Sequence, residues 1–177
     1  MIRAIALDEG WTTTTQAEHA TFDQVSVLGL RAVLACTHFL PSSGGRPPRV
    51  AVTLQAAEPG DDPVLGQVAT LRSAGEDLDP LLAAHVTGRS GRAFVFPGMA
   101  ALDRIVTVET LVSTSAVDDV VTLGGTAARS TDRIDTQNFL RPEFTAGRLV
   151  LRTRPSVGVD LVPFEQPHPT PCCASHN

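Results

Sequence analysis

The sequence contains no lysine and no tyrosine. Lysine forms Schiff bases, anchors pyridoxal phosphate and holds nucleotide phosphates in P-loops, so its absence excludes these reaction classes. Without tyrosine, the chain also has no phenol that could act as a catalytic acid. Both absences narrow the range of functions before any motif is considered.

Familiar enzyme signatures are missing as well. The chain has no G-x-G-x-x-G, no G-x-x-x-x-G-K-[ST], no H-E-x-x-H, no G-x-S-x-G and no C-x-x-C. These patterns bind nucleotide phosphates, hold catalytic zinc, present a nucleophilic serine or form a redox pair. Nucleotide cofactors, zincin proteolysis and α/β-hydrolase chemistry therefore have no support in the sequence.

Negative charge exceeds positive charge. Fourteen arginines face nineteen acidic residues, which gives a net charge of −5 at pH 7. Nucleic acids and anionic lipid surfaces attract basic proteins, so we expect neither nucleic acid nor a membrane as the main partner. A small-molecule ligand or a protein partner fits this charge better.

Hydrophobic runs are short and cysteines are few. The first run, residues 2–7, ends at once in Asp8 and Glu9, and the longest, residues 25–34, is interrupted by polar residues. Both fall short of the roughly 20 apolar residues that span a bilayer. Three cysteines, two of them adjacent, do not form the even framework of a secreted mini-protein. We expect a cytoplasmic protein with reduced thiols, whose core needs neither a metal nor a disulfide.

The first half of the chain carries helix signals. Thr21 and Gln24 have the spacing of a capping box, which predicts a helix over residues 22–37, although a buried strand is the alternative because few positions there are polar. Residues 49–54 alternate like a strand. Asp-Pro pairs followed by glycines predict two further helices, over residues 62–75 and residues 79–88.

The second half carries strand signals. We expect strands at residues 93–96, 105–114, 120–123, 149–154 and 160–164, with the second and third forming a hairpin. The sequence therefore predicts an α+β fold, with a mainly antiparallel, possibly mixed, β-sheet and two or three helices packed on one face. A βαβ unit, pairing the strand at Val50 in parallel with the strand at Phe94, is the alternative.

We expect one globular domain over residues 1–164, followed by a proline-rich extended tail over residues 165–177. Four prolines within residues 163–171, at and just before the start of this tail, prevent a helix, and the tail ends in Cys-Cys-x-x-His. Thiolates and imidazoles bind Zn²⁺, and thiolates bind Cu(I), so a soft-metal site or a thiol redox group is one hypothesis. A packed or solvated tail is the other, because chain ends tolerate change. The candidate ligands are Cys172, Cys173, His176 and His168.

Other candidates are spread along the chain. His85, on the apolar side of its helix, and Asp119, in the expected hairpin loop, are candidate acids or bases, with a core histidine and a solvated turn as the alternatives. Arg89 and Arg92 flank glycines that could form an anion-binding nest, and Arg133 lies in a segment crowded with arginine and aspartate.

Three functions follow from these observations. The favoured one is a small protein that binds a ligand or a protein partner and whose tail binds a soft metal or acts as a thiol redox group, with no cofactor required for folding. An enzyme without a cofactor, acting on a small anionic substrate through His85 or Asp119, is the alternative. A structural subunit of a homo-oligomer is the third.

Overall fold

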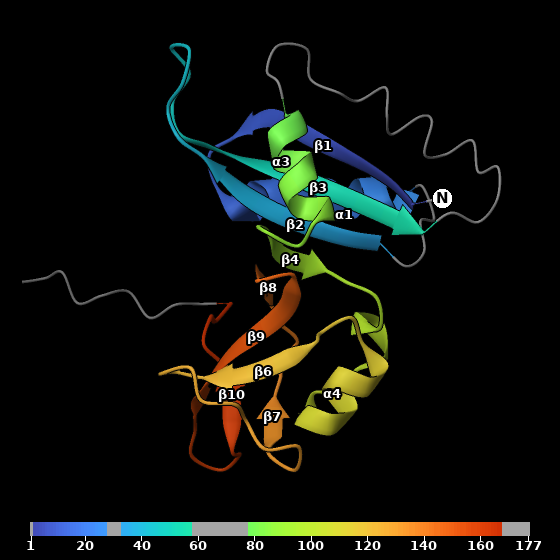
Figure 1. Cartoon of the computed structure of the whole chain (residues 1–177), viewed down its shortest axis with the longest axis vertical. Helices are drawn as coiled ribbons and strands as arrows, with labels where there is room; N and C mark the ends of the chain where they lie inside the picture. Colours follow the sequence, from blue (N-terminus) through green and yellow to red (C-terminus); the bar gives the residue numbers. More distant parts are fainter. Residues whose placement is uncertain (1, 28–32, 58–77, 168–177) are drawn as a thin grey trace, which may run out of the picture.

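Figure 1 shows a computed structural model of the chain, which describes residues 2–27, 33–57 and 78–167. The strands of the first half are β1 (Ile2–Trp11), β2 (Val33–Leu40), β3 (Arg49–Ala57) and β4 (Arg92–Val95). Those of the second half are β5 (Ile105–Thr107), β6 (Asp119–Thr122), β7 (Arg133–Asp135), β8 (Glu143–Thr145), β9 (Arg148–Pro155) and β10 (Leu161–Pro163). The helices are α1 (Thr14–Val27), α3 (Asp79–Val86) and α4 (Val108–Thr114), and η1 (Met99–Ala101) is a short 3-10 turn.

These described strands form one sheet of ten, in the order β1-β3-β2-β4-β8-β9-β10-β7-β5, with β6 paired to β9. Most neighbours are antiparallel, whereas β6 with β9 and β7 with β10 are parallel. The predicted α+β class with a mainly antiparallel sheet is confirmed. No helix within the described residues is long and apolar enough to cross a bilayer.

The first three strands of the sheet, β1, β3 and β2, form a layer with a helix on each face (Figure 1). On one face, alternate residues such as Val50 and Val52 of β3 pack with Ala17 and Phe22 of α1. On the other face, Thr53 of β3 contacts α3. The helices thus divide between the two faces instead of sharing one, because β3 is buried on both sides.

Helix α1 begins and ends earlier than the capping box suggests. Thr13 caps it, since the backbone N–H of Gln16 donates to the Thr13 hydroxyl over 3.2 Å. Thr21 lies inside the helix, where its hydroxyl donates to the carbonyl of Ala17 over 2.7 Å. The prediction of a helix over residues 22–37 was therefore wrong for residues 33–37, which belong to β2, whereas residues 28–32 lie outside the described residues. The buried-strand alternative holds only for Val33 and Leu34, at the start of β2.

Two of the other predictions for the first half are confirmed, and a third falls on residues that the structure does not describe. The strand at residues 49–54 is β3, and the helix after Asp79-Pro80 is α3, with proline in its first turn. The predicted helix over residues 62–75 lies outside the described residues. The strand at Val50 and the strand at Phe94 do run in the same direction, but β2 lies between them and pairs antiparallel with both.

In the second half, residues 105–114 are not one strand. Only β5 is extended, and α4 follows it directly, because the Thr107 hydroxyl accepts from the N–H of Thr110 over 3.1 Å and starts the helix. The spacing of Val108 and Leu111, both buried, then suits one face of a helix. The predicted hairpin was therefore wrong: β5 pairs with β7, and β6 pairs with β9. The strands predicted at residues 93–96, 120–123, 149–154 and 160–164 correspond to β4, β6, β9 and β10.

Two hydrophobic cores result, and β4 contributes to both. Phe94 packs with α1 and the first three strands, whereas Ala93 and Phe96 pack with residues of the second half such as Leu111 and Leu151. Between the cores, β4 is the strand that continues the sheet from β2 to β8. A single domain over residues 1–164 stays a prediction.

Gly98 provides a test of how the turn after β4 packs against α4. Its φ is +84°, and an added Cβ would lie 2.1 Å from the carbonyl oxygen of Thr114, the last residue of α4. We expect Gly98→Ala to lower the free energy of unfolding in urea by at least about 2 kcal/mol more than Gly158→Ala does. Gly158 is the matched control, because its φ is +86° and nothing lies within 4 Å of the added Cβ. Equal losses in the two variants would show that the turn does not touch α4.

Candidate functional site

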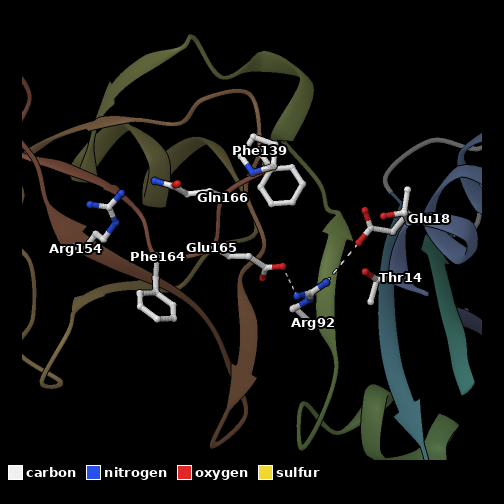
Figure 2. A pocket seen from close by; sticks show the side chains of 10 residues that line it. Thr14, Glu18, Arg92, Phe139, Arg154, Phe164, Glu165 and Gln166 are labelled. Carbon is white, nitrogen blue, oxygen red and sulfur yellow. Dashed lines mark hydrogen bonds and ion pairs between the residues drawn. The ribbon is translucent and has the colours of Figure 1, made fainter. Parts of the chain in front are cut away.

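A pocket of about 470 Å³ lies between the start of α1 and the segment that follows β10 (Figure 2). This volume falls within the range of small-molecule sites in proteins. Its walls come from both halves of the molecule, and they combine four charged side chains with two aromatic rings and two hydroxyls. The lining residues are Thr14, Thr15, Glu18, Arg92, Phe139, Arg154, Phe164, Glu165, Gln166 and Pro167.

Glu18, on the inner side of α1, is the buried acid of this pocket. Its side chain is 10% exposed, and the guanidinium of Arg141 donates to both of its carboxylate oxygens, over 3.2 Å and 2.5 Å. Arg141 is itself held above the ring of Phe139, 3.9 Å from the ring centroid. A buried carboxylate requires such partners, because an unpaired charge is expensive to remove from water.

Arg92, from β4, links two carboxylates. Its Nη2 lies 3.6 Å from Glu18, and its Nη1 donates to Glu165 in the segment after β10 (Figure 2). Its Nε is buried and has no hydrogen-bond partner among the described residues. The sequence predicts Arg92 as an anion-binding residue. In the structure, the anionic groups that it binds are two carboxylates of the same chain, those of Glu18 and Glu165.

Arg154, from β9, is the remaining cation of the pocket, and its side chain stands apart from these pairs in Figure 2. It is half-buried, and within the described part of the chain its guanidinium has no ion pair or hydrogen bond. Nothing in the sequence indicated it, since an arginine on an alternating strand is indistinguishable from a solvated one. The nearby start of α1 adds the hydroxyls of Thr14 and Thr15 and the positive end of a helix dipole.

The other two predicted anion-binding arginines do not reach this pocket. Arg89 is exposed and donates to the hydroxyl of Thr87 over 2.9 Å. Arg133 lies on β7, where it pairs with Asp160 at 3.6 Å beside an open depression of about 620 Å³. The three arginines therefore belong to three different places in the fold.

Asp119, a predicted acid or base, is engaged in local structure. Its carboxylate pairs with Arg148 at 3.1 Å and accepts from the N–H of Val120 over 2.8 Å. It begins β6, in the second half of the molecule, whereas His85 lies on α3 beside the first three strands (Figure 1). The fold does not bring the two predicted catalytic residues into contact.

His85 is part of a buried polar cluster that also contains His38 and Thr53. The Thr53 hydroxyl lies 2.8 Å from Nε2 of His38 and 2.9 Å from Nδ1 of His85, and all three side chains are buried. A hydroxyl has one proton to give, so at least one ring must donate an N–H to it. Nε2 of His85 has no hydrogen-bond partner among the described residues.

Burial controls the titration of this cluster. Burial lowers the pKa of His85 to about 4, and burial together with the neighbouring His85 lowers the pKa of His38 to about 4. Burial also raises the pKa of the Cys36 thiol, which lies on the same face of β2 as His38. The sequence predicts His85 as a buried histidine but gives no sign of its partner, because His38 lies on another element.

The predicted metal ligands His168, Cys172, Cys173 and His176 lie outside the described residues, so the metal and redox hypotheses for the tail stay predictions. Among the residues that the structure does describe, no group of three or more histidine, cysteine or acidic side chains could hold a metal ion. Cys36 is buried and free.

Comparison of the chain with models of protein families, with curated proteins and with solved structures finds no match.

The buried histidines predict a pH-dependent stability. A histidine titrates near 6.5 when unfolded but near 4 in this cluster, so between these values the unfolded chain binds more protons. The free energy of unfolding is therefore at its full value above pH 6.5 and falls as the pH falls toward 4. We expect a loss of about 2 kcal/mol for each histidine between pH 7 and pH 5, measured by urea unfolding.

His38→Gln and His85→Gln should each flatten this dependence, since the substituted side chain does not titrate. His19, which is exposed on α1, is the matched control, and His19→Gln should leave the dependence unchanged. A pH dependence equal in all four proteins would show that the two rings are not held neutral by the fold.

Proposed function

We propose that this protein binds a small organic anion in the pocket between α1 and the segment after β10, with Arg154 as its anchoring charge. The observation that carries the proposal is the half-buried guanidinium of Arg154, which lines the pocket without a counter-charge among the described residues. A partly desolvated cation attracts an anion more strongly than an exposed one does. A carboxylate or phosphate group on a ligand would supply the missing partner.

The local charge supports an anionic ligand. The pocket and the small cavity that adjoins it are lined by four arginines and three glutamates, Arg92, Arg141, Arg152 and Arg154 against Glu18, Glu143 and Glu165. The six residues other than Arg154 are engaged in ion pairs with one another. One positive charge is therefore left over here, although the whole chain carries −5.

The uncharged walls support an organic ligand of modest size. Phe139 and Phe164 offer apolar faces, and the hydroxyls of Thr14 and Thr15 offer hydrogen bonds. Such a mixture suits an aromatic or short-chain carboxylate better than a bare inorganic ion. Among the described residues, the side chains of the pocket that could act as an acid or base are Glu18 and Glu165, and both are held in ion pairs with arginines, so we place the enzyme alternative second.

Isothermal titration with benzoate tests this proposal, with neutral benzamide as the matched ligand. Arg154→Gln should weaken benzoate binding by roughly 10- to 100-fold, because a hydrogen bond to a charged group contributes about 1.5–3 kcal/mol. Benzamide should bind weakly and without dependence on Arg154.

Arg148→Gln is the matched control, because Arg148 lies on the same strand but pairs with Asp119 outside the pocket. We expect its benzoate affinity to stay within about twofold of the unsubstituted protein. Equal losses in the two arginine variants, or tighter binding of benzamide than of benzoate, would reject Arg154 as the anchor.

A further inference from the structure

Arg92 has two carboxylate partners of different character. Glu18 is 10% exposed and is also fixed by Arg141, whereas Glu165 is 37% exposed and has Arg92 as its ion-pair partner in the described residues. A partly exposed pair of this kind contributes only about 0–1 kcal/mol, because water and salt screen it. Glu165 is therefore the partner that Arg92 can lose at low cost.

Open volume beside the ion pair of Arg92 and Glu165 allows the side chain of Glu165 to move away from Arg92. The larger pocket and the adjoining small cavity of about 70 Å³ are both lined by Arg92, Phe164 and Glu165. The ion pair thus stands at the boundary between them, with open volume on either side. Glu165 follows β10 on a segment without regular structure, one residue beyond Phe164, whose N–H still donates to the carbonyl of Arg152 on β9.

We infer that Glu165 occupies a second anion subsite at Arg92, and that the pocket therefore selects ligands with two negative charges. This inference rests on the proposed function and extends it. One carboxylate of the ligand binds Arg154, and the other replaces Glu165 on the guanidinium of Arg92. The side chain of Glu165 moves into solvent, while Glu18 and Arg141 keep Arg92 in position.

A ligand with one negative charge cannot make this exchange and also hold Arg154. Such a ligand leaves the ion pair of Arg92 and Glu165 in place, and its binding free energy comes from the contact with Arg154 alone. The ligand class is thus a small dicarboxylate or a related dianion, and Glu165 limits the preference for it, because the second carboxylate of the ligand must displace Glu165 from Arg92. Glu165 acts here as a specificity-determining residue, since its own carboxylate competes with the second charge of the ligand.

The test compares two probes of similar size, isophthalate with two carboxylates and benzoate with one, by isothermal titration of the full chain. Glu165→Gln removes the internal competitor. We expect it to raise the ratio of isophthalate affinity to benzoate affinity roughly two- to fivefold, the range that corresponds to a partly exposed ion pair. Removal of any nearby negative charge favours a dianion over a monoanion, so the ratio is also compared with a control that removes a neighbouring charge and with a variant that keeps the charge of Glu165.

Glu143→Gln is the matched control. Glu143 pairs with Arg152 beside the small cavity but does not line the larger pocket, so its loss should leave the ratio unchanged. Glu165→Asp gives an independent variant, because the shorter side chain keeps the charge but withdraws it from Arg92. We expect it to raise the ratio as well.

Two failures can be told apart. If benzoate binds in a manner that depends on Arg154, but the ratio is unchanged or lower in both Glu165 variants, the displaceable subsite is rejected and the proposed function stands. If neither probe binds to any form of the protein, the proposed function is rejected and this inference with it.

Discussion

The burial of one carboxylate, that of Glu18, is the constraint on which the arrangement of the two halves depends. Helix α1 is fixed on the first core by Ala17 and Phe22, and this places Glu18 against the second half of the molecule. An ionised side chain there is tolerated only with charged partners. Arg92 from β4 and Arg141 from the loop before β8 supply them, and the ion pair with Arg141 also ties α1 to the second half.

These ion pairs also shape the candidate site. Arg92 is shared between Glu18 and Glu165, and Glu18 also pairs with Arg141, which does not line the pocket, so both carboxylates of the pocket already have cationic partners. Arg154 is left without a counter-charge in the described part of the chain. The unpaired positive charge of Arg154, which would attract a ligand, thus follows from the ion pairs that join the two halves. A structural requirement at Glu18 and a binding property at Arg154 have one physical origin.

Local signals predicted the elements that local physics determines. The Asp-Pro start of α3 and the alternating residues of β3 were sufficient for those elements. The helix start predicted at Thr21 was wrong because a threonine that bonds the backbone of its own helix has the same sequence pattern as a capping residue. The strand predicted over residues 105–114 was wrong because β-branched residues also suit the buried face of α4. The site was harder still: Glu18 and Arg141 are 123 positions apart, and no periodicity or short motif joins residues at that separation.

The most direct test of the role of Glu18 is a double-mutant cycle with Glu18→Gln and Arg141→Met, in which the free energy of unfolding is measured by urea for the four proteins. If Glu18 and Arg141 hold the two halves together, each single substitution leaves the other side chain of the pair without its partner. The double variant should then lose less free energy of unfolding than the sum of the two single variants. We expect a coupling free energy of about 2 kcal/mol. Losses that add within about 0.5 kcal/mol would contradict this account, because they would show that α1 is held on the second half by something other than this pair.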